Sequence, residues 1–314
     1  MGEFEIIDRY FRDLNGRDGV VVGIGDDCAV VDWPGPLAIS TDTLVAGVHF
    51  PEDTAAASIG HRCLAVNLSD LAAMGATPLG FTLALTLPQA DPAWLSGFAA
   101  GLGRLARRFE MALLGGDTTR GPLAISVHVI GRAPAAGSLL RSGGQVGDGV
   151  YVSGHLGGAL AGLEFVRERG LSGAQSAWVR RFLEPEPRVE LGQQLAGVAS
   201  AAIDISDGLL ADLGHLAAAS GCGASLMLEA LPVADGLADF YGNAEALRRA
   251  VCGGDEYELC FTASATEAPR IERIARVTGV ALTRIGALVP GESIDCRLHG
   301  ADWQPGEAGG YEHF

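Results

Sequence analysis

Strand-like and helical segments alternate along both halves of the chain, and this alternation limits its fold more than any other feature of the sequence. In the first half, apolar runs typical of strands lie at 20–25, 29–31, 37–41, 80–87, 111–116 and 123–132, and helical patterns at 4–14, 55–75 and 91–109. The second half predicts strands at 149–153, 201–205, 224–228, 258–263 and 281–289, with helical patterns at 157–169, 176–198, 208–219, 244–251 and 267–278. Such alternation indicates an α/β or α+β protein and argues against an all-helical one.

Residues 133–149 form the stretch richest in Gly, Pro, Ala and Ser between two apolar strands, so we place a domain boundary there. The expected domains are residues 1–135 and 148–314. A chain of 314 residues, 48 % of them hydrophobic, is long enough for two ordinary domains. Two short motifs occur in both halves of the chain: ISTD at 39–42 resembles ISD at 205–207, and GGD at 115–117 resembles GGD at 253–255. These similarities leave open whether the two halves arose by duplication.

The charged residues exclude several kinds of chemistry. All 22 basic residues are arginine, so the chain has no P-loop lysine, no Schiff-base lysine and no kinase-type strand lysine. A formal net charge of −16 argues against nucleic acid or an anionic membrane as a partner. If the protein handles phosphate, arginines, backbone N–H groups and metal ions held by carboxylates must do so.

Cysteine usage and the first residues of the chain favour a cytoplasmic protein. Six cysteines are scattered without a C-x-x-C pair, as expected for reduced thiols in a core. The segment GEFEIIDRYFRDL at 2–14 is acidic and amphipathic, unlike a signal peptide, and no apolar run is long enough to span a bilayer.

Aspartates recur at the ends of the strand-like runs, where scaffolds present functional side chains. They are Asp27, Asp42, Asp117, Asp204 and Asp207. Any one of them alone is best explained as a turn or cap residue. As a set they would repel one another unless a divalent cation neutralised them, and oxygen ligands without a Cys/His set favour Mg²⁺ or Mn²⁺.

Asp70 lies inside the predicted helix 55–75, with Asn67 three residues earlier on the same face. Burying either group costs free energy unless it is paired. A bound metal or an internal hydrogen-bond network would remove that cost, and the spacing alone does not choose between them.

Two further segments have the composition of a phosphate site. GGDTTRG at 115–121 combines a flexible turn with hydroxyls and an arginine, although GGD also occurs in ordinary hairpins. Arg141, in the glycine-rich boundary segment, fits a phosphate clamp and a solvated linker arginine equally well. His49 follows the Asp42 strand closely enough to share its site, whereas the other histidines show no metal-ligand spacing.

Seven motifs, spread over nearly the whole chain, closely resemble the thiamine-monophosphate kinase family, which belongs to the fold superfamily of aminoimidazole ribonucleotide synthetase. In order they are GEFEIIDRYF, GIGDDCAVV, LAISTDTLVAGVHF, LAVNLSDLAAMGATP, LLGGDTTRGPL, AIDISDGLLADLGH and GGDEYELCFT. The resemblance implies a two-domain fold of that superfamily and a homodimer whose N-terminal domains form a shared β-barrel. It also implies direct in-line transfer from ATP to thiamine monophosphate, assisted by several Mg²⁺ ions.

The resemblance assigns roles to individual residues. The implied metal ligands are Asp27, Ser40, Thr41, Asp42, Asp70, Asp117, Asp204 and Asp207. Nucleotide binding would involve Gly116, Asp117, Arg141 and Ser206, and catalysis would depend on Asp42, Asp117 and Asp207. His49, Asp255 and Tyr311 would contact the acceptor, with Phe314 as the alternative to Tyr311.

The chain departs from the family pattern at one motif, and two other functions compete with the kinase. Where the family usually has GGEDYEL, this chain has GGDEYEL at 253–259, which puts the contact of Asp255 with the acceptor in doubt. A selenophosphate synthetase would need a lysine that this chain lacks, and a hydrogenase-maturation factor is the other rival within the superfamily. A non-catalytic nucleotide or metal sensor is the rival of a different class, although it would need fewer acidic residues.

Overall fold

The computed structural model describes residues 2–306, which form two compact units. The first unit contains the chain up to residue 71 together with 76–133. The second contains 72–75 and the chain from residue 134 onward. Among the described residues, no helix has both the length and the apolar character needed to cross a bilayer.

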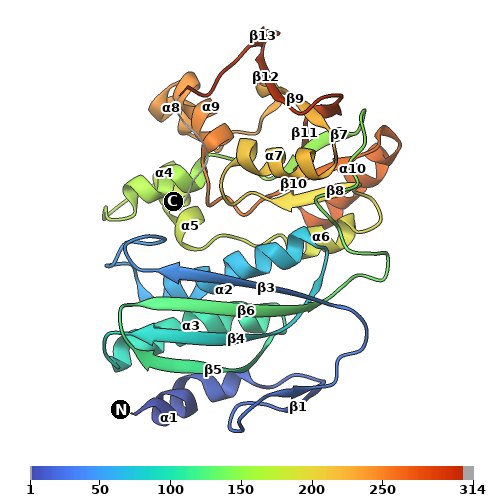
Figure 1. Cartoon of the computed structure of the whole chain (residues 1–314). Helices are drawn as coiled ribbons and strands as arrows, with labels where there is room; N and C mark the ends of the chain where they lie inside the picture. The colour runs from blue at the N-terminus through green and yellow to red at the C-terminus, as the bar shows by residue number, and fades with distance from the viewer. Residues whose placement is uncertain (1, 307–314) are drawn as a thin grey trace. The chain divides into compact units, whose positions relative to one another are not determined.

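The first unit is built on a four-stranded sheet with the strand order β3-β6-β4-β5. Its strands are β3 (Leu37–Val45), β4 (Thr77–Leu87), β5 (Ala112–Arg120) and β6 (Ala124–Arg132). β4 and β5 run parallel, and β6 is antiparallel to both of its neighbours. Helices α2 (Ala56–Ala73) and α3 (Pro92–Arg108) lie on one face of this sheet, as Figure 1 shows. The chain enters the unit through α1 (Glu3–Ile6), whose helical path continues to Leu14, and the small sheet β1 (Val20–Val22) with β2 (Val30–Val31).

Local sequence explains how the two helices form and pack. Asp91 caps α3 by accepting the N–H of Ala93 at 2.9 Å, and Pro92 occupies the first turn, where its missing N–H costs nothing. The helices approach so closely that a Cβ at Gly101 would lie 1.9 Å from the carbonyl oxygen of Ala57. Glycine is therefore required at this crossing.

The second unit contains a seven-stranded sheet with the order β13-β12-β9-β11-β7-β10-β8. Its strands are β7 (Gly149–Ser153), β8 (Ala201–Asp204), β9 (Gly223–Met227), β10 (Leu259–Ala263), β11 (Leu282–Val289), β12 (Ile294–Leu298) and β13 (Ala301–Asp302). Its helices are α4 (Gly158–Phe165), α5 (Gly173–Leu183), α6 (Val189–Leu195), α7 (Leu209–Ala219), α8 (Leu237–Tyr241), α9 (Asn243–Cys252) and α10 (Ala268–Thr278).

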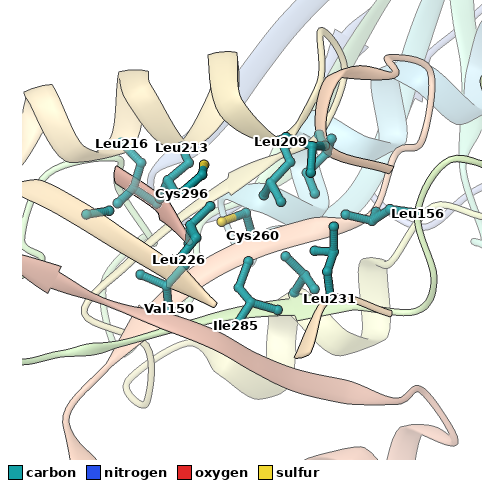
Figure 2. Packing of buried hydrophobic residues seen from close by; sticks show 14 of the residues in the cluster. Val150, Leu156, Leu209, Leu213, Leu216, Leu226, Leu231, Cys260, Ile285 and Cys296 are labelled. Atoms are coloured by element: carbon teal, nitrogen blue, oxygen red, sulfur yellow. The ribbon is translucent and has the colours of Figure 1, made fainter. Parts of the chain in front are cut away.

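Helix α7 supplies one side of the core of the second unit. Its residues Leu209, Leu213 and Leu216 are spaced to share one helix face, and all three are completely buried. Figure 2 shows this row of leucines in the same cluster as Cys260 of β10 and Ile285 of β11. This packing anchors α7 firmly, so the loop before it has a rigid support.

Most expected elements form close to their predicted positions, with informative exceptions. Residues 117–120, which follow the expected strand 111–116 and were expected as part of a turn, continue strand β5, because β4 provides a parallel partner from Thr82 to Leu87. Asp42 and Asp117 therefore lie inside strands and not at strand ends, whereas Asp204 ends β8 as predicted. The helix expected at 157–169 ends at Phe165. Helix α8 and strands β12 and β13 were not expected, since such short segments carry little periodic signal.

Candidate active site

In the first unit, strand β3 brings predicted ligands together with helix α2. The Ser40 hydroxyl donates to Asp70 Oδ2 at 2.5 Å, and the Asp42 N–H donates to Asn67 Oδ1 at 3.0 Å. The Asn67 side-chain amide donates in turn to the carbonyl oxygen of Cys63 at 2.9 Å. Asn67 is thus satisfied by the hydrogen-bond network that the spacing left as one of two explanations.

Asp42 and Asp70 form a pair of like charges. The pKa of Asp42 is raised from 3.8 to about 6, first by burial and second by the charge of Asp70. Carboxylate and hydroxyl oxygens are the ligands that Mg²⁺ prefers, so Asp42, Asp70 and Ser40 fit one end of a metal site. Among residues 2–306, however, no three Asp, Glu, His or Cys side chains already form a metal-binding group.

Thr41 and Asp117 lie on the other face of the same sheet. Thr41 alternates with Ser40 and Asp42 along β3, and its hydroxyl hydrogen-bonds His128 Nδ1 of the neighbouring strand. The register places Asp117 beside Ala84, in the row that continues through Ser126 to Thr43. Three strand spacings amount to about 14 Å. Within one chain, therefore, the sheet separates Asp117 from Asp42 and Asp70.

Gly116 lies where only glycine fits. Its φ of +153° is accompanied by close contact with β4, since a Cβ at this position would be 1.8 Å from the carbonyl oxygen of Leu83. The missing side chain therefore makes room for the backbone of β4, and Gly116 itself is exposed.

The remaining predicted residues of the first unit lie in connecting segments. Asp27 is exposed between β1 and β2. His49 Nδ1 accepts the N–H of Val45 at 3.0 Å, so a neutral ring carries its proton on Nε2. Tyr311 and Phe314 lie outside the described residues.

In the second unit, the segment after β8 lies directly beside the segment before β10. The N–H of Asp255 donates to the carbonyl oxygen of Ser206 at 2.7 Å, and the N–H of Tyr257 donates to that of Ile205 at 2.8 Å. Gly254 permits this approach, because a Cβ there would lie 2.5 Å from the Ser206 carbonyl oxygen. The structure therefore joins the predicted nucleotide and metal segment 204–207 to the predicted acceptor residue Asp255.

Asp255 and Tyr257 both adopt left-handed backbone conformations, with φ of +64° and +51°. Such values are uncommon outside glycine and are a genuine outlier for a bulky residue such as tyrosine. The Tyr257 hydroxyl donates to Asp255 Oδ1 at 3.0 Å, which fixes the two side chains relative to each other.

Two buried glutamates that sequence reasoning missed hold this strained segment in place. Glu256 Oε1 accepts the N–H groups of Gly157 and Ala159 at 2.7 and 3.1 Å, and Arg181 Nε donates to its Oε2 at 2.6 Å. Glu258 receives Arg181 Nη2 at 2.8 Å and two bonds from Arg188 at 2.6 and 2.7 Å. The sequence contained one feature that could have pointed to these glutamates: the two acids lead directly into an apolar strand.

Asp212, a third acid missed from the sequence, lies in the first turn of α7 and is 3 % exposed. Its Oδ2 accepts three consecutive backbone N–H groups, those of Ser206, Asp207 and Gly208, at 3.0, 3.1 and 3.1 Å. The signal was an aspartate within the otherwise apolar helix LLADLGHL.

Arg141 is exposed, and only its main chain is anchored by the bonds described here. Its carbonyl oxygen accepts the Ser220 hydroxyl at 3.0 Å, and the carbonyl oxygen of the preceding Leu140 accepts the N–H of Ala202 in β8 at 2.9 Å. The guanidinium is therefore presented from a fixed backbone, as a phosphate clamp requires.

Family models of known proteins match most of the chain. Residues 25–133 match the family model of the AIR synthase related protein, N-terminal domain, and residues 145–299 match that of the C-terminal domain. The thiamine-monophosphate kinase of Salmonella typhimurium is 45 % identical, over 100 % of this chain and 98 % of the relative.

Solved structures show the same fold. The thiamine-monophosphate kinase from Stenotrophomonas maltophilia K279a has a TM-score of 0.84 at 43 % identity, over 90 % of this chain and 92 % of that one. A structure described as AaThiL complexed with AMPPCP and TMP has a TM-score of 0.79 at 30 % identity, over 100 % of this chain and 97 % of that one. The chain thus has the mixed α/β, two-domain fold of these proteins.

Proposed function

The chain belongs to the thiamine-monophosphate kinase family, and we propose that it transfers the γ-phosphoryl group of ATP to thiamine monophosphate, giving thiamine diphosphate and ADP. The observation that carries this proposal is the hydrogen-bonded contact between the Ser206 segment and the Asp255 segment. One of these segments is assigned to the nucleotide and the other to the acceptor. Transfer between two substrates needs their binding groups side by side, and the contact between these two segments would supply that arrangement.

The reaction asks little covalent chemistry of the protein. A phosphate oxygen of thiamine monophosphate attacks the γ-phosphorus, and the bond from that phosphorus to the bridging oxygen of ADP breaks. The attacking oxygen is already ionised at neutral pH, so no general base is needed. Catalysis then consists of alignment and charge neutralisation, in which Asp42, Asp117 and Asp207 are the proposed essential groups.

The proposed metal ligands are divided between the two units. Asp27, Ser40, Thr41, Asp42, Asp70 and Asp117 belong to the first, and Asp204 and Asp207 to the second. The pKa of Asp42, raised first by burial and second by the charge of Asp70, supports this assignment. When bound, Mg²⁺ would neutralise charge on the phosphate oxygens.

The remaining proposed contacts are shared between the nucleotide and the acceptor. Gly116, Asp117, Arg141 and Ser206 would bind ATP, and His49, Asp255 and Tyr311 would contact thiamine monophosphate. The exposure of Arg141 and of Gly116 supports the first group. The fixed geometry of Asp255 beside Tyr257 supports the second.

We also propose a homodimer in which the first units of two copies form a shared β-barrel. The sheet face opposite α2 and α3 carries Ile39, which is 57 % exposed, and Leu37, which is 39 % exposed, on the edge strand β3. Asp117 lies on that same face. A second copy would cover this apolar surface. A cytoplasmic location, where ATP is made available to such enzymes, completes the proposal.

The test is an assay of the purified protein with ATP, Mg²⁺ and thiamine monophosphate, in which thiamine diphosphate and ADP are both quantified by chromatography. We expect the two products in equal amounts and none in the presence of EDTA. ADP without thiamine diphosphate would indicate another acceptor within the superfamily. ATP binding without any ADP would indicate a sensor.

A further inference from the structure

The carboxylate of Asp212 is unusual in where it lies and in what it binds. It is almost completely buried, yet its hydrogen bonds described above all go to backbone N–H groups of one short loop. Burying a carboxylate is costly, and the three N–H bonds and the positive end of the α7 dipole offset only part of the cost, because burial still raises the pKa of Asp212. The loop in question carries Ser206 and Asp207, the residues assigned to the nucleotide and the metal.

Ordinary helix capping does not require this arrangement. The cap position of α7 is Gly208, which has no side chain to accept a hydrogen bond. In ordinary capping, a Ser or Asp at this position satisfies one or two N–H groups without a buried charge. The Asp212 side chain lies within the helix, and one of its oxygen atoms accepts hydrogen bonds from three consecutive N–H groups that precede the helix. Since Leu209, Leu213 and Leu216 fix α7 in the core, the carboxylate fixes the loop to that core.

The bonds to Asp212 also determine what the loop can offer a ligand. Consecutive N–H groups at a helix N-terminus would otherwise form an anion site for phosphate. Here Asp212 occupies them, so the loop contributes side chains and not backbone donors. Ser206 and Asp207 are both partly exposed, while Asp212 beneath them is buried.

We propose that Asp212 is a positioning residue of the kinase: it holds the main chain of residues 206–208 so that the side chains of Ser206 and Asp207 are set in place for the metal–nucleotide complex. This inference rests on the proposed function. It assigns no substrate contact and no proton transfer to Asp212. Because the Ser206 carbonyl also receives the N–H of Asp255, the acceptor segment is anchored through the same loop.

The test uses two substitutions in the full-length protein. Asp212→Asn keeps an oxygen that can accept the three N–H bonds, and Asp212→Ala leaves them without an acceptor. The dissociation constant of the analogue AMPPCP in the presence of Mg²⁺ is measured by calorimetry. The Mg²⁺ concentration that gives half-maximal kinase activity is measured in the kinase assay. For Asp212→Ala we expect both quantities to rise about tenfold or more, because small displacements of positioned groups cost up to ~10²-fold. For Asp212→Asn we expect changes within about threefold, because its hydrogen bonds are kept.

Leu226→Ala is the control, since Leu226 of β9 is completely buried in the same core but does not belong to the helix that holds the loop. This variant should lower the melting temperature as Asp212→Ala does, but leave AMPPCP affinity and the Mg²⁺ requirement unchanged. Equal effects of Leu226→Ala and Asp212→Ala on binding would reduce Asp212 to a stability role and overturn the proposal. If Asp212→Ala does not fold, the proposal is tested with Asp212→Asn alone. Because this variant keeps the hydrogen-bond acceptor, a loss of AMPPCP binding would contradict positioning by hydrogen bonds.

The binding measurement separates this proposal from the proposed function. A wild-type protein that binds AMPPCP with Mg²⁺ but does not phosphorylate thiamine monophosphate would refute the function alone. The comparison of Asp212→Ala with Asp212→Asn would still test the positioning role.

Discussion

The fold places the carboxylate of Asp42 beside that of Asp70. The raised pKa of Asp42 shows whether its ionisation stabilises or destabilises the native state. The folded-state pKa of about 6 exceeds the ordinary 3.8, so ionised Asp42 destabilises the native state as the pH rises through this range. Asp42→Asn should therefore melt at the same or a higher temperature than the wild type at pH 8 with EDTA. It should also lose most of the stabilisation by Mg²⁺ and about 10²-fold or more of kcat, because charge stabilisation worth several kcal/mol is removed.

Thermal unfolding with and without Mg²⁺, together with kcat, measures both effects. Asp302→Asn is the control, because its side chain is 88 % exposed and paired only loosely with Arg297, 3.9 Å away. It should leave Mg²⁺ stabilisation and kcat unchanged. Near-normal turnover in Asp42→Asn would remove Asp42 from the metal site.

Asp255 is the residue at which this chain departs from the usual motif of its family. Its left-handed backbone suits Asp and Asn better than longer side chains, and its Oδ1 holds the Tyr257 hydroxyl. Asp255→Glu should raise the Michaelis constant for thiamine monophosphate more than that for ATP, because the added methylene displaces the acid from its partner. Asp255→Asn, which keeps the hydrogen-bond acceptor, separates the effect of geometry from that of charge. A larger change in the constant for ATP would move Asp255 out of the acceptor site.

Among the elements, the segment between α9 and β10 depends most on buried charge. Burial alone would lower the pKa of Arg181, but Glu256 and Glu258 outweigh it and raise that pKa. Glu256→Ala leaves Arg181 Nε and the N–H groups of Gly157 and Ala159 without their acceptor and should destabilise the second unit by about 3–5 kcal/mol in urea unfolding. Glu256→Gln should cost less, since its amide oxygen can still accept the N–H groups of Gly157 and Ala159.

An exposed ion pair of similar length serves as the control for this prediction. Arg270 and Glu267 lie 2.9 Å apart with side chains 47 % and 27 % exposed, so Glu267→Ala should cost less than about 1 kcal/mol. Equal losses for Glu256→Ala and Glu267→Ala would mean that burial adds nothing to the Glu256 network. They would also leave the left-handed backbone of Asp255 and Tyr257 without the support assigned to it.

The same elements show what could be predicted from the sequence and what could not. Apolar periodicity located the long helices and buried strands. The residue pattern singled out Asp42 and Asp70 separately, and the structure shows that their charges interact. The strand expected at 111–116 was found, but its continuation from Asp117 to Arg120 was missed, because a polar turn-like segment becomes a strand only when β4 lies beside it. The roles of Asp212 and Glu256 were also missed, because their partners are backbone N–H groups, which carry no signature in the sequence.

For the whole molecule, the division of the acidic residues between two units and two sheet faces could not have been foreseen from the order of the motifs. The motifs suggested one cluster. The register separates Asp117 from Asp42 by about 14 Å across the sheet and places them on opposite faces. Asp117 instead shares its face with the exposed Ile39, so the proposed role of Asp117 and the proposed dimer concern the same surface.

Ile39→Arg tests that surface. Ile39 is already 57 % exposed in one chain, so the substitution should leave the fold of the subunit intact while placing a buried charge in the proposed barrel. By light scattering after size exclusion, the wild type should have twice the 32.4 kDa mass of one chain and Ile39→Arg the mass of one. Val277→Arg, at a 63 % exposed position on α10, should remain dimeric and active.

If Asp117 acts at the interface, kcat of the Ile39→Arg variant should fall together with the mass measured by light scattering. A wild type that is monomeric and fully active would refute the dimer, whereas a dimer unaffected by Ile39→Arg would place the interface on another face.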